Sequence, residues 1–326
     1  MKKIAYFLLA ALFAVSVTAC KQQNDSSSQT SVEESSIQSS VDEISETESQ
    51  NEPMPNIPEY SEDISEESTE SEFIPPVQTT VDDYESVVVN NKCRLLLYKG
   101  TEQRIFFPDK VTVDGKEYET EIGPGCFRDT DIITLSLPDN ITVIPESMCE
   151  NCQMLELVSF ENVQTIEKNA FWKCENWKFT FPDLNFGDQT KIKRIGERAF
   201  GYTGLYGKVT IRPDMELDVG AFQVCEKIEE VEILNGITEI PERAFANNTG
   251  LKKITLPETL TKIGEAAFTY NITESIIIPK SVTEMGYEAV TSNKGGGKYT
   301  GIMLGYKGSA AEEYANKNGI IFSPLD

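Results

Sequence analysis

Apolar residues recur with a period of about 22 positions between residues 120 and 292. Each period opens on the pattern I-G/P-x-x-A-F, of which Ile195-Gly-Glu-Arg-Ala199-Phe200 is a clear copy. The steps between copies are 22 or 23 residues, with one longer step of 29. Sustained self-similarity at such a period is typical of a repeat solenoid. The first apolar residues of the eight copies are Ile122, Ile144, Ile166, Ile195, Leu217, Ile240, Ile263 and Met285.

The second half of each repeat predicts a β-strand. Cys or Asn commonly stands three positions after the Ala-Phe pair, and an alternation such as Leu251-x-x-Ile254-x-Leu256-Pro257 follows. Such alternation favours a half-buried strand, with Ile254 and Leu256 pointing inward. Because one coil cannot bury its own apolar face, we expect one short strand per coil, stacked into a single sheet. The outward positions of that sheet are Thr134, Ser136, Ser159, Lys178, Thr180, Lys208, Thr210, Glu230, Glu232, Lys253, Thr255 and Ser275.

The combined pattern, I-G-x-x-A-F-x-x-C/N followed by L-x-x-I-x-L-P, resembles the BspA-like leucine-rich repeats of bacterial surface proteins. The resemblance covers residues 120–292 and implies a leucine-rich-repeat solenoid with a cap at each end. It places the N-terminal cap in residues 81–119, as a β-hairpin with strands around Arg94–Tyr98 and Arg104–Phe107 and a turn at Asp114-Gly115. It also implies adhesion to host or matrix proteins or to other bacteria, without specifying the ligand.

Residues 293–326 are expected to form the C-terminal cap, a strand-helix-strand unit, also by the resemblance. Ser309 and Glu312 have the spacing of a capping box, and Gly319 is suited to end a helix. One short helix leading into a last strand is therefore predicted. The preceding Lys294-Gly-Gly-Gly-Lys298 favours a flexible loop, because it lacks the sequence and the strand-to-helix context of a phosphate-binding loop.

The first twenty residues have the order of a secretion signal. Lys2 and Lys3 precede an apolar run, 4–15, that is too short to span a bilayer permanently, and Val17-Thr18-Ala19-Cys20 closes the segment. Cys after small residues is the acceptor pattern of bacterial lipoproteins. We expect residues 1–19 to be a lipoprotein signal peptide and Cys20 to carry the lipid anchor. The alternative is an ordinary signal peptide with a chance cysteine.

After Cys20 the composition changes to that of a disordered segment. Residues 21–80 hold 15 acids, one Lys and 14 Ser, a net charge of 1 − 15 = −14. Such a segment cannot bury enough apolar surface to offset its ordering entropy. Residues 20–80 are therefore predicted to be a lipidated Cys followed by an acidic stalk, which could reach about 200 Å when fully extended.

Residues 81–326 carry 38 acids and 26 bases, and the whole chain contains no His. A net negative domain argues against nucleic acid as a partner, since phosphate binding needs a cationic surface. The absence of His removes the commonest general base and metal ligand, together with Ser-His and Cys-His arrangements. Carboxylate pairs are not excluded by this absence. With the surface character of the sheet described below, we expect neither a cofactor nor an enzyme.

The cysteines fall mostly on repeat positions. Cys149-Glu-Asn-Cys152 has the spacing of a redox or zinc site, but Cys149 stands at a Phe position and Cys152 at the Cys/Asn position, both expected to be buried. Cys152 and Cys174 are equivalent in adjacent coils, so a disulfide between them is an alternative to free buried thiols. Pairing stays open at this point for Cys93, Cys126, Cys149, Cys152, Cys174 and Cys225.

Two groups of residues are candidates for ligand binding. Glu230 and Glu232 are expected to point outward between lysines of the coils before and after, as a ladder of opposite charges that stabilises the sheet modestly. A glycosidase carboxylate pair is the alternative there. The 29-residue step is rich in aromatic residues, which either anchor a ligand or form a small satellite core. The candidate ligand-binding residues are Trp172, Trp177, Tyr202, Tyr206, Lys208, Glu230 and Lys253.

The sequence therefore predicts a monomeric solenoid, held outside the bacterial membrane, that recognises a protein or glycan without catalysis. Long rows of small polar side chains form a surface and not a cleft. A spacing component of the envelope without a specific ligand is the main alternative. A surface hydrolase is a second one.

Overall fold

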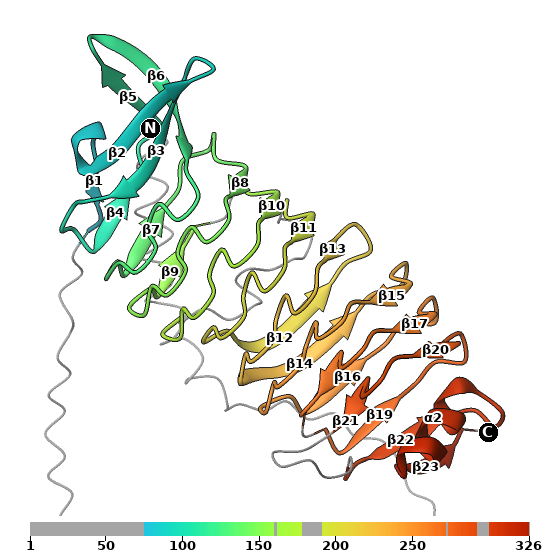
Figure 1. Cartoon of the computed structure of the whole chain (residues 1–326). Helices are drawn as coiled ribbons and strands as arrows, with labels where there is room; N and C mark the ends of the chain where they lie inside the picture. Colours follow the sequence, from blue (N-terminus) through green and yellow to red (C-terminus); the bar gives the residue numbers. More distant parts are fainter. Residues whose placement is uncertain (1–74, 160–161, 178–190, 272, 292–299, 326) are drawn as a thin grey trace, which may run out of the picture. The chain divides into compact units, whose positions relative to one another are not determined.

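The computed structural model describes residues 75–159, 162–177, 191–271, 273–291 and 300–325, all within one compact unit, Thr69–Asp326 (Figure 1). The predicted signal peptide, Cys20 and most of the stalk lie outside these residues. So do Lys178 and Thr180, the aromatic residues of 178–190, and the glycine loop at 294–298. The fold below is therefore that of the repeat region and its two caps.

The N-terminal cap is a four-stranded sheet in the order β2-β3-β6-β5. Strands β2 (Tyr84–Val89) and β3 (Lys92–Tyr98) form one hairpin, and β5 (Lys110–Val113) and β6 (Lys116–Ile122) form another that turns at Asp114-Gly115 as predicted. A short 3₁₀ turn, η1 (Val81–Asp83), precedes β2.

The predicted pairing of residues 94–98 with 104–107 is wrong. The antiparallel partner of β3 is β2, which the two-residue Asn90-Asn91 turn places beside it. Strand β4 (Arg104–Phe106) instead pairs in parallel with β7, because its buried Ile105 belongs to the core of the first coil. On its other side β4 pairs with β1 (Val77–Gln78), so the ordered cap begins ahead of residue 81.

One strand of each described coil belongs to the predicted row. These strands stack in parallel, but they form three hydrogen-bonded groups, β1-β4-β7-β9, β12-β14-β16 and β19-β22-β23, in place of one continuous sheet. The strand expected between β9 and β12, with Lys178 and Thr180, lies outside the described residues. The row consists of β7 (Thr134–Ser136), β9 (Leu157–Val158), β12 (Tyr206–Ile211), β14 (Lys227–Ile233), β16 (Lys253–Thr255), β19 (Ser275–Ile277), β22 (Ile302–Gly305) and β23 (Ile321–Pro324).

Seven of the eight repeats also contribute a second strand of two residues at the start of the I-G/P-x-x-A-F motif, whereas Ile122 of the first repeat ends the cap strand β6. These strands pair in parallel and in register, so that Ile144, Ile166, Ile195 and Leu217 follow one another across four coils. A third short pair joins β18 (Phe268–Thr269) to β21 (Val290–Thr291). The second row consists of β8 (Val143–Ile144), β10 (Thr165–Ile166), β11 (Arg194–Ile195), β13 (Glu216–Leu217), β15 (Glu239–Ile240), β17 (Lys262–Ile263) and β20 (Glu284–Met285).

The phenylalanines of the repeats stack along the inside of the coils. From Phe171 to Phe268, successive rings lie 5.5 to 5.6 Å apart and within 16° of parallel. Phe127 instead packs with Tyr98 and other aromatic rings of the cap. Between Phe127 and Phe171, the equivalent position is held by the buried Cys149. The aromatic core therefore has two parts with a thiol between them.

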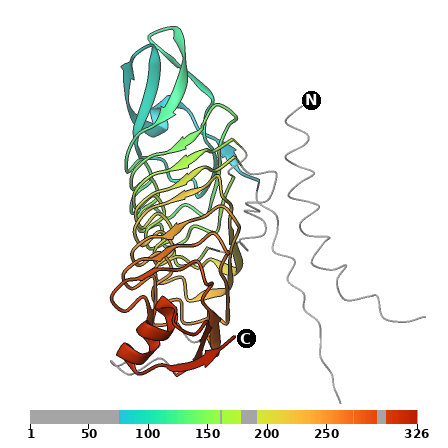
Figure 2. The same cartoon turned by 90° about the vertical axis from the view of Figure 1, so that its right-hand side faces the viewer.

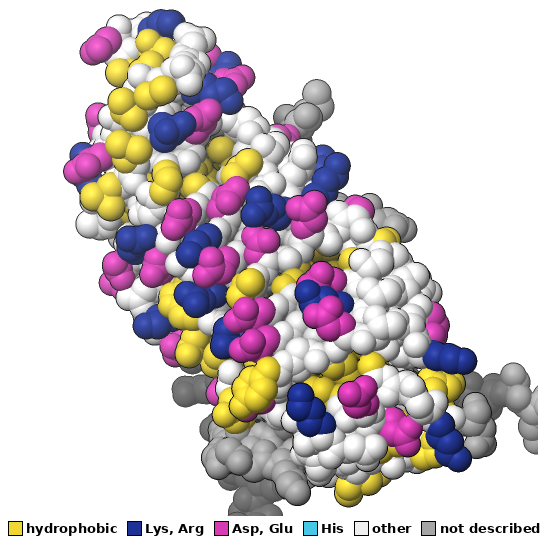
Figure 3. All heavy atoms as spheres, turned by 45° about the vertical axis from the view of Figure 1, so that its right-hand side comes forward, with side chains coloured by type: hydrophobic (Ala, Val, Ile, Leu, Met, Phe, Trp, Pro, Cys, Tyr) yellow, Lys and Arg dark blue, Asp and Glu magenta, His cyan; other side chains and the backbone are white. Residues whose placement is uncertain are grey.

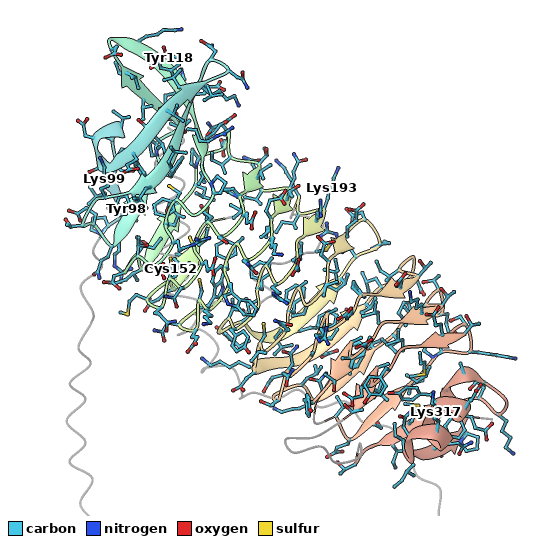
Figure 4. All side chains as sticks on the ribbon, viewed as in Figure 1. Tyr98, Lys99, Tyr118, Cys152, Lys193 and Lys317 are labelled. Carbon is cyan, nitrogen blue, oxygen red and sulfur yellow. The ribbon has the colours of Figure 1, made fainter. Side chains whose placement is uncertain are left out.

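A second buried row runs through the Cys/Asn positions. The thiols of Cys152 (Figure 4), Cys174 and Cys225 donate hydrogen bonds to backbone carbonyls of the preceding coil at 2.9 to 3.0 Å. The amide of Asn271 donates to a carbonyl of the preceding coil in the same way, at 3.0 Å, and its side-chain oxygen accepts from the Asn248 backbone N–H at 2.9 Å. Thiol and amide therefore serve the same purpose, because each satisfies a buried backbone group.

The C-terminal cap closes the stack as predicted, and α2 (Ala310–Asn318) connects the paired parallel strands β22 and β23. Figure 2 shows this helix at the C-terminal end of the stack. The Ser309 side chain accepts a hydrogen bond from the backbone N–H of Glu312, and Gly319 ends the helix in the left-handed conformation. The carboxylate of Glu312 accepts from the Gly308 N–H. In the part of the chain that the structure describes, no helix is both long and apolar enough to cross a membrane.

A candidate recognition surface on the solenoid

Strands β12, β14 and β16 place three of the candidate residues in one row. The strand register sets Lys208 beside Glu230 and Glu230 beside Lys253. The Lys253 Nζ lies 2.9 Å from the Glu230 carboxylate, and the Lys208 Nζ lies 3.6 Å from Glu230 and 2.9 Å from Glu232. The ladder of opposite charges predicted from the sequence is confirmed. Lys and Arg are likewise interspersed with Asp and Glu over the face in Figure 3.

The ion pairs hold both partners in their charged forms. The hydrogen bond to Glu232 raises the pKa of Lys208 above its ordinary value. The hydrogen bond from Lys253, together with the charge of Lys208, lowers the pKa of Glu230. A general acid of a glycosidase needs a raised carboxyl pKa, so the shift at Glu230 has the wrong direction for that role.

A shallow hollow of about 490 Å³ lies at the N-terminal ends of these strands. Tyr206, Gly207, Glu229 and Lys252 contribute to its wall. A bulge in the pairing of β12 with β14 falls between Gly207 and Lys208, and Gly207 takes a positive φ of 80°. Bulges re-aim side chains locally. The hollow therefore presents a half-exposed tyrosine ring next to the Lys252–Glu229 ion pair, whose atoms are 2.7 Å apart.

Trp172 and Tyr202 form a second cluster, at the turns that follow two Ala-Phe pairs. Their ring centroids are 4.7 Å apart with the planes at 68°, and the Arg198 guanidinium lies 5.8 Å from the Trp172 ring. Gly201 makes room for this ring, since a Cβ there would come within 2.4 Å of it. Trp172 is partly exposed and Tyr202 is exposed, so the cluster offers an aromatic surface.

Two residues expected at the surface are buried. Trp177 is 1 % exposed and packs edge-on against Phe171 and Phe200, at 5.0 and 6.0 Å, so it is a core residue and not a ligand contact. It stands three positions after Cys174, where the repeats of Cys152, Cys225 and Asn248 have Leu or Ile, so its repeat position was the signal that indicates burial. Thr134, expected to point outward, is also buried, between its register partners Arg104 and Leu157 on the adjacent strands.

The six cysteines of the described residues are buried free thiols. Burial raises the pKa of Cys149 and Cys174, while a hydrogen bond with Cys149 lowers the pKa of Cys152. Cys149 and Cys174 are therefore held as neutral thiols inside the coils. Within the described ranges, no group of three or more Cys, Asp or Glu residues is arranged to hold a metal ion.

Parallel coils with an inward Leu/Ile strand and a Cys/Asn row define a leucine-rich-repeat solenoid. The model of the BspA type leucine rich repeat region matches residues 110–200 and 183–295, with six copies, and these matches span more than half of the chain. The chain belongs to this family. The predicted leucine-rich-repeat solenoid is thereby confirmed.

Solved structures support the same fold. A leucine-rich repeat protein from Bacteroides ovatus matches with a TM-score of 0.53 and 18 % identity, over 76 % of this chain and 67 % of its own. A leucine-rich repeat protein from T. pallidum matches with a TM-score of 0.51 and 15 % identity, over 76 % of this chain and 98 % of its own. At these identities the similarity concerns the fold alone. A comparison with curated proteins gives no match.

Proposed function

We propose that the chain is an exported lipoprotein whose solenoid recognises a protein or glycan outside the bacterial cell without catalysing a reaction. The observation that carries the proposal is the exposed face of β12, β14 and β16. It combines the paired charges of Lys208, Glu230 and Lys253 with the hollow at Tyr206. Exposed aromatic rings beside hydrogen-bonding charged groups suit both peptide and sugar ligands.

Three features support a role without catalysis. The described carboxyl groups with a clearly shifted pKa, Asp214 and Glu230, both have it lowered by hydrogen bonds to basic side chains. The chain also contains no His to act as a general base. Membership of a repeat family built on a regular solenoid agrees with a binding protein.

The proposed location rests on the segment before the solenoid. The charged, apolar and small-residue order of residues 1–19 favours export, and Cys20 is placed to receive the lipid. The acidic residues after it would hold the solenoid away from the membrane. Labelling with a fatty-acid analogue tests this step. Cys20→Ser should abolish labelling and release the protein into the medium, and labelling that persists in the variant would contradict it.

The recognition role is tested by screening residues 69–326 on arrays of host proteins and of glycans. Trp172→Ala and Tyr206→Ala should each weaken capture at least about tenfold, the loss expected for a central aromatic anchor. Tyr287→Ala is the matched control, because Tyr287 is 71 % exposed and lies outside both clusters. Equal capture by all three variants would show that the ligand does not bind at Trp172 or Tyr206. Capture of nothing, with altered envelope integrity after deletion of the solenoid, would favour the spacing role.

A further inference from the structure

Strand β2 is an outer edge of the cap sheet (Figure 1). It carries consecutive exposed apolar residues. Val87, Val88 and Val89 are 41 %, 39 % and 37 % exposed, so both faces of the strand are partly exposed. Hydrophobic side chains also gather at the cap end in Figure 3. No described strand pairs with the outer side of β2. Proteins usually protect such edges with Lys, Pro or a covering element, and β2 contains neither Lys nor Pro.

The hairpin geometry determines which backbone groups of β2 point outward. Asn90 and Asn91 both have positive φ, at 51° and 61°, as in a type I′ turn, and Val89 is paired with Lys92. In a two-residue hairpin this flanking pair exchanges hydrogen bonds, and the direction alternates along the strand. Val89 and Val87 therefore direct their N–H and C=O groups to β3. Val88 directs its own groups away from the sheet.

We propose that two copies of this chain pair through β2, antiparallel, about a two-fold axis at Val88. The Val88 N–H of each copy donates to the Val88 carbonyl of the other. On one face, Val87 of each copy meets Val89 of the other, and on the opposite face the two Val88 side chains meet. The two four-stranded cap sheets then continue into one, and every exposed valine of the edge is covered by another valine.

The charges agree with this register. Glu85 falls opposite Asn91 of the second copy, and not opposite its own equivalent, so like charges do not meet directly. On the face that carries Val87 and Val89, the side-chain nitrogens of Lys92 and Arg94 already form ion pairs with the Glu121 carboxylate, at 3.5 and 3.1 Å. Pairing of the two β2 strands leaves both of these ion pairs intact. A strand that is neutral and apolar at its centre is complementary to a second copy of itself, as a two-fold interface requires.

Cross-linking of the full chain tests the register. Val88→Cys should form a disulfide-linked dimer under mild oxidation, since hydrogen-bonded antiparallel partners have Cα atoms about 5.5 Å apart, within disulfide range. Glu85→Cys is the matched control. In the proposed register, residue 85 of one copy lies six residues along the strand from residue 85 of the other. The two positions are therefore about 20 Å apart, and Glu85→Cys should not cross-link. Both variants and the reference chain carry Cys20→Ser, which removes the seventh cysteine, and the reference chain gives the background because its six described thiols are buried.

Sedimentation equilibrium tests the association itself. The unmodified chain should associate reversibly to a dimer between about 1 and 500 µM, as expected for a small interface. Val88→Lys should weaken that association at least tenfold, since it places two like charges on the axis, while Val219→Lys, at an exposed valine outside any strand, should not. Circular dichroism verifies that both variants fold. A chain that stays monomeric, equal cross-linking by both Cys variants, or a dimer that survives Val88→Lys would overturn the proposal.

Discussion

The rings of Phe222 and Phe245, in successive coils, lie 5.5 Å apart with an angle of only 2° between their planes. Both side chains are fully buried. Because each ring contacts the equivalent ring of the next coil, the Ala-Phe motif specifies the stacking distance as well as the interior of one coil. The small Ala beside each Phe lets the neighbouring backbone approach.

Phe245→Ala should remove the ring at the centre of this stack. The cavity is bounded by Phe222 and Phe268, whose positions the backbone hydrogen bonds between coils hold in place. We expect the free energy of unfolding to fall by about 3 to 5 kcal/mol, measured by urea denaturation. Tyr287→Ala, at an exposed ring, should change it by less than about 0.5 kcal/mol. If Phe245→Ala lowered the free energy of unfolding as little as Tyr287→Ala, the stacking interpretation would be contradicted.

The thiol of Cys225 should make the protein sensitive to alkaline pH. Burial raises its pKa from 9.0 to about 11. The thiol is thus protonated in the folded state, where it donates to the Phe200 carbonyl, while the unfolded chain loses the proton at lower pH. Its contribution to stability is complete below pH 9.0 and is lost as the pH rises through about 11.

Cys225→Asn tests that contribution, because Asn248 and Asn271 occupy the same repeat position in the next two coils. The variant should keep the fold. Its melting temperature should fall less than that of the unmodified protein between about pH 8.5 and pH 11, the interval over which the Cys225 thiol titrates in the unfolded and folded states. The other buried thiols remain as an internal reference. An unchanged pH dependence would show that Cys225 does not contribute to it.

Gly201→Ala should reorient Trp172 without unfolding the coil. The new Cβ would meet only the Trp172 ring closely, at 2.4 and 2.6 Å, and a side chain can rotate away. Trp172 should then leave Tyr202, so that its fluorescence shifts to longer wavelength and is quenched more strongly by iodide. The signal of the buried Trp177 should stay constant. An unchanged emission spectrum would contradict this geometry.

Gly204→Ala provides the contrast. Its Cβ would meet two backbone carbonyls, of Glu175 at 2.3 Å and Trp177 at 2.8 Å, which cannot rotate away. We expect a loss of about 1 to 3 kcal/mol in the free energy of unfolding, as for other overpacked sites. Thermal denaturation of the two variants side by side distinguishes the mobile contact from the rigid one.

The charged row should contribute little to stability, and its contribution should depend on salt and acid. Glu230→Gln should cost less than about 1 kcal/mol in low salt, and less still in 1 M salt, as for other exposed pairs. Since Lys253 lowers the pKa of Glu230, the contribution is present above the ordinary value of 4.5 and is lost as the pH falls through the lowered one. Melting curves of both proteins at several pH values measure it. A cost that is independent of salt would contradict the interpretation.

The repeat region could be predicted because its determinants lie within each period. The Ala-Phe pair, the Cys/Asn position and the inward strand residues recur at fixed spacing, so the register of Lys208, Glu230 and Lys253 followed from the sequence. The helix limits at Ser309 and Gly319 were local signals as well. Such features need no knowledge of distant contacts.

The caps and the aromatic cluster depend on contacts that spacing does not encode. Pairing of β3 with β2 and not with β4 was decided by an Asn-Asn turn outside the expected hairpin. Trp177 was counted with the surface residues because of its type, although its position three residues after Cys174 is a core position. Residue type misled where repeat position would have given the correct burial.

The position of Cys149 affects how the solenoid unfolds. Its small side chain separates the aromatic cluster of the cap from the phenylalanine stack that begins at Phe171. Repeat proteins unfold by losing contacts between neighbouring coils, so we expect a weak junction at this position among the described coils. In native-state hydrogen exchange we expect the chain on its two sides to open as separate cooperative units. Cys149→Phe would join the two into one if the added volume is accommodated.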